Sequence, residues 1–525
     1  MTVRARIADA LTVALALTAA ACSSPPPEGP QLTVGTTSGQ VHGLATASAR
    51  EFLGVRYALA PTGERRWTAP QPAPAPAGVV DATRPGARCS QGTQAAGTSE
   101  DCLFLNVTTP RDQAPGERLP VMVWWHGGGY TSGSGADYDA QRLASRGHVV
   151  VVTVNYRLGV FGYLGLPGLA GSGNFGFADQ LAATHWAKDN AAAFGGDPGN
   201  LTVFGESAGG MSACALLTSP QAAGLVQRVA ISSGSCFLNW PAGGLFPGVP
   251  AQTPYTSLAT DQADGVVTAN QLGCTGAGAL QCLRRLPADK LLPVSTAFSD
   301  HLAYGTDLLP ENPPDAVRAG RIARIPVLSG GNHDEARSFM GGAAMADPSS
   351  ITEATYPQLV RAAFGVRAAD VLREYPLQRF PTPVEAFSTV ITDAAWSCPT
   401  LAGNQALART TKVFPYEFAE SHAPNVNQVN VPGMAQGAAH ATDTPYLFDL
   451  GGKNLLTDPA QARLGERMVG YWSGFARTGT PAAPGAADIV PGTATSTSVL
   501  SLTAAGENVV DSGSDHHCGF WPRNP

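Results

Sequence analysis

The sequence predicts an α/β fold in which a large, mostly parallel central sheet has helices on both faces. Strand-like apolar runs alternate with helix-like runs through the interior of the chain, which is typical of such sheets. These runs occupy residues 149–154, 178–194, 201–205, 228–233 and 412–418. In addition, a Gly-x-Ser-x-Gly segment stands directly between one strand-like run and the helix-like run that follows it.

Other segments are expected to elaborate this sheet. Antiparallel strands around 32–43 are expected at its edge, and a helix over 462–477 is expected to pack against the body of the protein. The aromatic residues of that helix belong in the core by this interpretation: Tyr471, Trp472 and Phe475. Stretches rich in Pro and Gly predict insertions over the face where a site would lie, at 240–254, 305–320 and 341–357.

The Gly-x-Ser-x-Gly segment comprises residues 205–209 and is centred on Ser207. It follows the strand-like run 201–204 and precedes the helix-like run 211–217. Glycines two before and two after the serine permit a sharp turn that presents Ser207 Oγ above the sheet, with a helix N-terminus aimed at it. The pattern therefore predicts an attacking serine, although the same five residues also occur by chance in many chains.

A second glycine-rich turn lies upstream, where the apolar strand 119–125 runs into His126-Gly-Gly-Gly. Acyl transfer places negative charge on a carbonyl oxygen, and backbone N–H groups that no side chain shields can stabilise that charge. We therefore expect the oxyanion hole to consist of the N–H groups of Gly128, Gly129 and Ala208. The alternative is a simple turn after a buried strand.

Many segments of the chain resemble the type-B carboxylesterases and cholinesterases, a family with the α/β-hydrolase fold. Besides the two glycine-rich turns, the segments that carry the resemblance are 52–58, 99–107, 154–162, 174–176 and 194–198. They follow the family's order, and the resemblance extends from about residue 32 to the C-terminus. It implies a serine carboxylester hydrolase. Because the family elaborates a single large sheet and no charge-rich linker interrupts the chain, we expect one catalytic domain over 32–525.

The serine needs a general base, and the chain order of serine, acid and histidine in this fold restricts the choice among ten histidines. This order excludes the four that precede Ser207: His42, His126, His148 and His185. His440 lies in a loop of small residues, 437–443, that resembles the family's histidine loop. Small neighbours leave room for the imidazole to reach both serine and acid. The remaining alternatives are a surface-loop role for His440, with His516 and His517 as the next candidates.

The acid is expected at the end of the buried strand-like run 325–330, where sites of parallel sheets lie. Two adjacent carboxylates qualify there. The resemblance assigns the role to Glu335, while Asp334 is more simply a turn or capping residue. The resemblance also implies a buried polar network of Glu206, Ser233 and Asp443. The family usually has a longer glutamate where Asp443 stands, and the alternative is that these carboxylates are solvated.

Nine cysteines indicate an oxidising compartment. By resemblance to the family, we expect three disulfides: Cys89–Cys102, Cys274–Cys282 and Cys398–Cys518. Cys214 and Cys236 are either bridged or buried thiols. The cysteine spacings lack the partnering histidines of a zinc site, so we expect no metal and no cofactor.

The N-terminus predicts export. Two arginines precede an apolar stretch too short to span a bilayer, as in a signal peptide over residues 1–21. Three alanines then meet Cys22, which resembles a bacterial lipobox and predicts lipidation of Cys22, with residues 22–31 as a tether. The leucine usual three positions earlier is missing, so ordinary secretion after cleavage at Ala21 is the alternative. The net charge of −7 argues against nucleic acid or an anionic membrane surface as partner.

These features together predict a serine esterase that acts through an acyl-enzyme on small-molecule esters. An amidase or carbamate hydrolase would share the machinery, and a non-catalytic binding protein would share the fold. The loop between Cys89 and Cys102 has no aromatic residue to hold a quaternary ammonium group. We therefore expect uncharged short- to medium-chain esters to be preferred over choline esters, unless Trp240 or Tyr255 supplies the missing ring.

Overall fold

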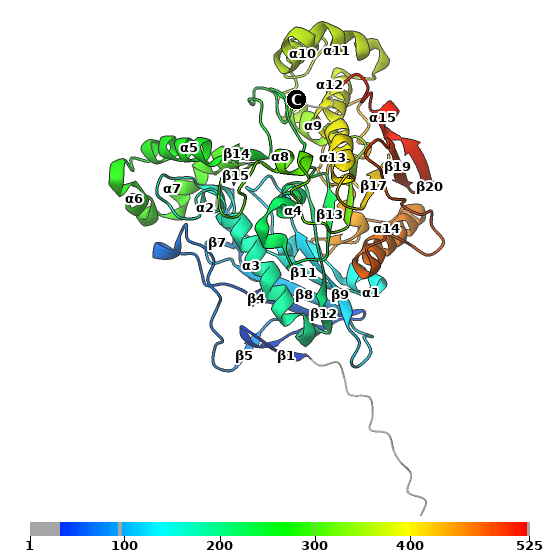
Figure 1. Cartoon of the computed structure of the whole chain (residues 1–525). Helices are drawn as coiled ribbons and strands as arrows, with labels where there is room; N and C mark the ends of the chain where they lie inside the picture. The colour runs from blue at the N-terminus through cyan, green and yellow to red at the C-terminus, as the bar shows by residue number, and fades with distance from the viewer. Residues whose placement is uncertain (1–31, 93–96, 300, 522–525) are drawn as a thin grey trace, which may run out of the picture. The chain divides into compact units, whose positions relative to one another are not determined.

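A computed structural model describes residues 32–92, 97–299 and 301–521. Its centre is an eleven-stranded sheet of order β20-β19-β17-β16-β13-β12-β9-β11-β8-β4-β3 (Figure 1). The strands are β3 (Leu44–Ala45), β4 (Ala49–Arg56), β8 (Phe104–Pro110), β9 (Leu119–Trp125), β11 (Val150–Val154), β12 (Gly196–Glu206), β13 (Arg228–Ser232), β16 (Val327–Asn332), β17 (Val413–Phe418), β19 (Ser498–Thr503) and β20 (Gly506–Asp511). In the sheet order, the neighbouring strands β11, β9, β12, β13, β16, β17 and β19 pair in parallel. The outer strands β20, β8, β4 and β3 pair antiparallel with their neighbours. The predicted α/β fold is confirmed.

Helices cover both faces of this sheet. The central strand β9 is apolar at every position because both of its faces are buried. Val121, Val123 and Trp125 belong to one hydrophobic cluster, together with α3 (Phe175–Asn190) and α4 (Ala208–Thr218). Met122 and Trp124 belong to the cluster on the opposite face, with α1 (Gln141–Gly147) and α14 (Pro459–Thr478). Because alternate residues point to opposite faces, a strand that is covered on both sides has no polar position.

The N-terminal strands differ from the prediction. β1 (Thr33–Thr36) and β2 (Gly39–His42) pair antiparallel as expected, but they form a separate three-stranded sheet with β5 (Val79–Asp81). The expectation that they border the main sheet is wrong, since its edges are β3 and β20. At Gly43 a Cβ atom would lie 2.2 Å from the carbonyl oxygen of Glu51 in β4, and directly after this glycine the chain joins the main sheet as β3, which pairs with β4.

The remaining helices and short strand pairs lie outside the eleven-stranded sheet. The helices are α2 (Gly159–Tyr163), α5 (Leu258–Gln271), α6 (Ala279–Arg285), α7 (Ala288–Leu291), α8 (Pro313–Arg318), α9 (Arg337–Ala346), α10 (Tyr356–Phe364), α11 (Ala368–Glu374), α12 (Pro383–Ile391), α13 (Cys398–Leu407) and α15 (Ser512–Asp515). Three two-stranded pairs accompany them: β6 (Arg88–Cys89) with β7 (Thr98–Ser99), β10 (Tyr138–Asp139) with β18 (Asp449–Leu450), and β14 (Tyr255–Ser257) with β15 (Leu302–Tyr304). Of the stretches expected as insertions, 305–320 contains the short helix α8, and 341–357 overlaps the end of α9 and the start of α10.

Four disulfides link the described chain: Cys89–Cys102, Cys214–Cys236, Cys274–Cys282 and Cys398–Cys518. The second of these settles the two cysteines that the sequence left open. Disulfides persist in oxidising compartments, which indicates a protein that functions outside the cytosol. Within the described ranges, no helix is both long and apolar enough to cross a lipid bilayer. The signal peptide 1–21, Cys22 and the tether 22–31 lie outside the described residues.

Candidate active site

Ser207 stands on a sharp turn between β12 and α4. Its φ of 56° and ψ of −124° lie where side chains rarely occur, and such strained conformations cluster at functional sites. Packing maintains the turn: a Cβ atom at Gly209 would lie 1.8 Å from the carbonyl oxygen of Trp125, and one at Gly205 would lie 2.5 Å from the carbonyl carbon of Gly209. The two glycines that flank the serine are therefore required by close backbone approach, as the sequence pattern predicts.

The upstream glycine run lies directly against this turn. A Cβ atom at Gly127 would come within 2.9 Å of Ser207 Cβ. Gly128 and Gly129 both have positive φ, at 104° and 58°, which glycine adopts readily. Ala208 is the first residue of α4, so its N–H belongs to the free N-terminal turn of that helix. The structure thus places the glycine run that contains Gly128 and Gly129 against the turn at Ser207, which Ala208 follows.

His126, the residue before the glycine run, contacts the backbone of that run. Its Nδ1 lies 2.7 Å from the carbonyl oxygen of Gly127, and its ring stacks on Tyr156 with centroids 4.3 Å apart. Burial lowers the pKa of His126 to about 4, so the imidazole is neutral at physiological pH. A neutral, stacked ring fixes the path of the chain into the glycine run without adding charge beside the serine.

His440 and Glu335 form the central contact of the site. The Nδ1 atom of His440 lies 2.6 Å from Glu335 Oε2. The other carboxylate oxygen of Glu335 accepts hydrogen bonds from Ser233 Oγ at 2.5 Å and from the backbone N–H of Asn332 at 2.8 Å. Glu335 is only 2% exposed. With both oxygens occupied, the carboxylate holds the imidazole in one orientation and favours the tautomer that carries its proton on Nδ1.

The other ring nitrogen of His440 faces the serine turn. Its Nε2 is buried, makes no hydrogen bond with any described residue, and lies 3.2 Å from Glu206 Oε1. Burial alone lowers the pKa of His440, but the negative charges of Glu206 and Glu335 outweigh it and raise the pKa to about 9. Burial also raises the pKa of Glu206. Glu206 is therefore a buried neighbour of the imidazole, and its alternative interpretation as a solvated carboxylate does not fit the structure.

The competing candidates occupy other positions. Asp334 accepts hydrogen bonds from the backbone N–H of Ala438, and it contacts His333 and Arg337 rather than the His440 ring. His516 is bound between two carboxylates, and His517 contacts Glu374. The geometry therefore favours Glu335 and His440 over these alternatives.

Asp443 and Asn332 connect the histidine loop, 437–443, to the turn at residues 331–335 that carries Glu335, here called the acid turn. Asp443 is buried, and burial raises its pKa. Its shorter side chain reaches the network through Asn332, whose Nδ2 donates to the carbonyl oxygen of Ala439 at 2.6 Å and approaches Asp443 Oδ1 at 3.5 Å. The sequence reasoning gave no role to Asn332. Its position between a predicted strand and a predicted acid is the only signal that would have found it.

Two aromatic rings that sequence reasoning also missed flank the imidazole. Phe339 of α9 and Trp396 lie 5.0 and 4.9 Å from the centre of the His440 ring, and they stack on each other. Trp396 belongs to a π-helical turn, Thr392–Ser397, a distortion that is frequent at functional sites. These rings restrict the imidazole and exclude water from one side of it.

Comparison with known proteins identifies the family. A model of the carboxylesterase family matches residues 30–521. The chain belongs to this carboxylesterase family. It is 33% identical to the para-nitrobenzyl esterase of Bacillus subtilis (85% of this chain, 90% of that protein). It is 32% identical to the fumonisin B1 esterase of Sphingopyxis macrogoltabida (94% and 85%) and 30% identical to human cocaine esterase (85% and 83%). The chain is accordingly a carboxylester hydrolase.

Several segments of this carboxylesterase that resemble its family have structural roles. Asn155 Oδ1 accepts hydrogen bonds from Ser134 Oγ and from the N–H of Gly135, while its Nδ2 donates to the carbonyl oxygens of Ala87 and Cys102. Arg157 and Asp179 form a buried bidentate ion pair at 2.7 Å. These contacts hold the loop after β11 beside the glycine run.

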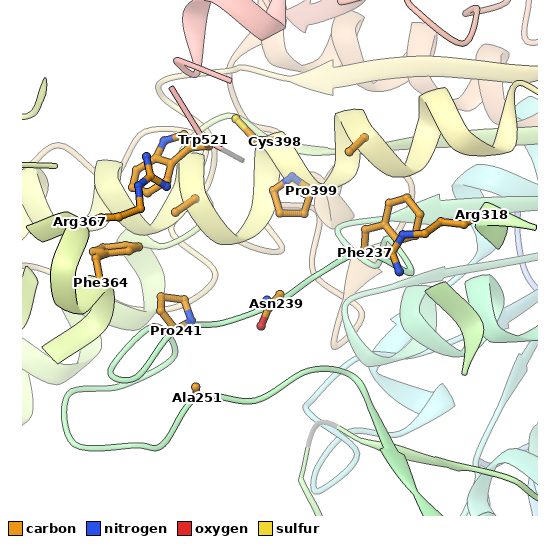
Figure 2. Close-up of a pocket in the computed structure, with 12 residues that line it drawn as sticks. Phe237, Asn239, Pro241, Ala251, Arg318, Phe364, Arg367, Cys398, Pro399 and Trp521 are labelled. Carbon is orange, nitrogen blue, oxygen red and sulfur yellow. The ribbon is translucent and has the colours of Figure 1, made fainter. Parts of the chain in front are cut away.

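A cavity of about 280 Å³ lies near the site in this carboxylesterase, and neither Ser207 nor His440 lines it. Figure 2 shows Arg367 beside Trp521 at one end and Arg318 beside Phe237 at the other. Asn239 and Pro241 also line this cavity. Trp240, which lies between these two residues in the sequence, packs on Trp396 with ring centres 5.4 Å apart, and Trp396 in turn contacts the His440 ring.

Proposed function

We propose that Ser207 is the nucleophile of this carboxylesterase, that His440 is its general base and that Glu335 orients the base. His440 Nε2 removes the proton from Ser207 Oγ, and the oxygen attacks the ester carbonyl. The tetrahedral intermediate collapses to an acyl-enzyme as His440 returns the proton to the departing alcohol. Water then attacks the acyl-enzyme with the same base and releases the acid.

The main support for this proposal is the hydrogen bonding of the two ring nitrogens of His440. Glu335 occupies Nδ1, and the buried Nε2 makes no other hydrogen bond within the described chain, so only Nε2 is available to accept a proton. Glu206 and Glu335 stabilise the imidazolium that forms, which explains why a buried histidine here has a raised pKa. The Ser207–His440 hydrogen bond itself is not formed between the described atoms. Catalytic hydrogen bonds frequently close only when substrate binds.

The N–H groups of Gly128, Gly129 and Ala208 are proposed to stabilise the oxyanion. Supporting this assignment, the glycine run packs against Ser207 and carries no side chain that would shield its backbone. Each such donor contributes about 100- to 1,000-fold to the rate of acyl transfer. The three donors come from two different segments, so the turn after β9 and the start of α4 must hold a fixed relation for the site to work.

The preferred substrates are proposed to be uncharged short- to medium-chain esters. No aromatic residue stands between Cys89 and Cys102 to supply a cation–π contact. The two residues that could supply such a ring instead are both buried: Trp240 is 1% exposed and Tyr255 is 5% exposed. The Tyr255 hydroxyl also donates to the carbonyl oxygen of Met211. A choline ester would therefore lack an aromatic partner from these positions.

A lipid anchor on Cys22 after removal of residues 1–21 is the proposed attachment to the cell envelope, with secretion as the alternative. The support is the alanine-rich stretch before Cys22 and the four disulfides, which require an oxidising compartment. The tether of residues 22–31 would separate the catalytic domain from the membrane surface.

Ser207→Ala tests the proposed nucleophile. Hydrolysis of p-nitrophenyl esters of graded acyl length should fall by at least about 1,000-fold, while the melting temperature stays near that of the wild type because the change removes one hydroxyl. An organophosphate should label the wild-type protein on the peptide that contains Ser207. Ser421→Ala, which removes an exposed hydroxyl, is the control and should retain full activity. Near-normal hydrolysis by Ser207→Ala would overturn the assignment.

A further inference from the structure

A second cluster of histidines and carboxylates lies beside the acid turn and contains none of the proposed catalytic residues. One ligand atom from each of His333, Glu417, Asp515 and His516 lies within 4.8 Å of the other three. The four residues come from the end of β16, from β17 and from α15 with the residue after it. The pairing of β16 with β17 places His333 next to Glu417, since the His333 N–H donates to the carbonyl oxygen of Phe418.

The two imidazoles are oriented alike within this cluster. His516 has its Nδ1 2.7 Å from Asp393 and its Nε2 2.9 Å from Glu417. His333 has its Nδ1 3.1 Å from Asp334 and its Nε2 3.3 Å from Asp515. In both rings a carboxylate outside the group of four holds Nδ1, which leaves Nε2 directed at the centre of the cluster.

This arrangement is typical of metal-binding histidines. A histidine ligand almost always donates its second ring N–H to a carboxylate or carbonyl group, which fixes the tautomer and the ring orientation. Here both histidines have such a partner. The partner of His516 is itself held, because the Tyr375 hydroxyl donates to Asp393 at 2.8 Å.

We propose that His333 Nε2, His516 Nε2, Glu417 and Asp515 bind a divalent zinc ion. Two imidazole nitrogens and two carboxylate oxygens match the ligands and the coordination number of zinc, whereas calcium and magnesium prefer oxygen ligands alone. Ligand atoms of a tetrahedral zinc site lie about 3.3 Å apart, given bonds of about 2.0 Å. The His333–Asp515 and His516–Glu417 pairs already have such spacings, at 3.3 and 2.9 Å.

Charge and access support the same site. Four carboxylates, those of Asp334, Asp393, Glu417 and Asp515, surround the two imidazoles, whose ring centres lie 4.9 Å apart. A divalent ion at the centre of the cluster would therefore lie among negative charges. The Asp515 side chain is 53% exposed, so an ion can enter from solvent.

The sequence predicted no metal because that reasoning considered cysteine spacing alone. The four ligands of this cluster come from three distant segments and have no motif spacing. A bound ion would join the acid turn to α15, close to the Cys398–Cys518 disulfide, and so would act as a second staple of the C-terminal segment.

Metal content and spectroscopy of the full-length, tag-free protein test this proposal. After treatment with EDTA and addition of Zn²⁺, desalted wild-type protein should retain one zinc per chain by mass spectrometry and melt at a higher temperature than the EDTA-treated sample. Substitution with Co²⁺ should give the intense visible bands of four-coordinate cobalt. Retention of no zinc, or cobalt bands typical of six-coordinate aqueous ions, would overturn the proposal.

Three variants locate the ion. Asp515→Asn removes one ligand from an exposed position, so it should fold normally and weaken zinc affinity by at least about 10- to 100-fold. Asp370→Asn alters an aspartate whose side chain is equally exposed, at 51%, and should bind zinc as the wild type does. His422→Ala removes an exposed surface histidine and tests for adventitious binding. Equal zinc affinity in Asp515→Asn and the wild type would show that the ion lies elsewhere.

Discussion

Replacing Glu206 by Gln removes a negative charge beside the proposed base while keeping the size of the side chain. Glu206 Oε1 lies 3.2 Å from His440 Nε2, and both groups are buried. A base must be neutral to accept a proton, so kcat/KM falls as the pH drops below the apparent pKa of His440. Because Glu206 stabilises the protonated ring, its removal should lower that pKa and move the acid limb of the pH profile to lower pH.

The expected size of the change follows from the same contact. Unit charges 3.2 Å apart interact with about 5 kcal/mol at an effective dielectric constant of about 20. Burial opposes most of this energy, since the pKa of His440 rises only from 6.5 to about 9 with Glu335 also present. Among the charges that raise it, Glu206 contributes most. We expect Glu206→Gln to move the acid limb by about 1 to 2 pH units, the usual effect of one neighbouring charge.

The same charge stabilises the imidazolium that forms in the transition state. Its loss should therefore lower the alkaline plateau of kcat/KM by about 10- to 100-fold, at about 1.4 kcal/mol per factor of ten. The wild-type and variant profiles should consequently converge at low pH, where the wild-type base is protonated and the variant base is still partly neutral. This convergence distinguishes an electrostatic role of Glu206 from a general loss of structure, which would lower the whole profile.

The assay is pH-stat titration of a neutral ester such as ethyl butyrate, which has no chromophore that titrates. Profiles should run from about pH 6 to about pH 10, so that they bracket the expected pKa values. Glu64→Gln serves as the control, because the Glu64 side chain is 81% exposed, and its profile should match that of the wild type. An acid limb of Glu206→Gln that stays in place or moves to higher pH would refute the reasoning.

Three further outcomes are expected. Glu335→Gln should lower kcat/KM by about 1,000-fold or more, because an amide cannot balance the imidazolium. Asp334→Asn should lower it only several-fold; the reverse ranking, measured with the same ester, would move the acid by one residue. Full-length protein expressed in a lipoprotein-processing bacterium should partition into detergent, whereas Cys22→Ala should not, and an unmodified Cys22 in the mature N-terminal peptide would indicate ordinary secretion. Acetylthiocholine should be hydrolysed with lower kcat/KM than a matched neutral thioester; the opposite order would contradict the expected preference for uncharged esters.

The central strands could be predicted from the sequence because helices cover both faces of the sheet. A run such as 119–125 is apolar at every position, and β9 has those same bounds. The N-terminal strands carried a weaker signal, since β1 and β2 each bury one residue fully, Val34 and Val41. With so few buried side chains, nothing in the pattern indicates which sheet they join. The parallel pairing of β2 with β5 defines that sheet, and this contact between distant segments is a property of the folded chain.

The residues of the site also fall into two groups, those that the sequence could predict and those that only the structure shows. Ser207 and the glycine run are local motifs, and each is recognisable because the backbone geometry requires glycine at fixed positions. The residues that hold the imidazole are not local. Phe339 and Trp396 meet His440 only because α9 and the π-helical turn pack against the histidine loop. No spacing in the sequence records such a contact, so these rings could be found only in the structure.

The turn after β16 connects the proposed active site at His440 with the proposed zinc site at His333. Its adjacent carboxylates contact different rings: Glu335 contacts His440, and Asp334 contacts His333. A loss of activity in Asp334→Asn therefore has two possible origins, displacement of Glu335, the proposed acid, or loosening of the proposed zinc site. Measuring the variant with EDTA and again with added Zn²⁺ separates them, because saturating metal should restore activity only if His333 has lost its orientation. Glu335→Gln should be indifferent to the metal, since its defect lies at the imidazole of His440.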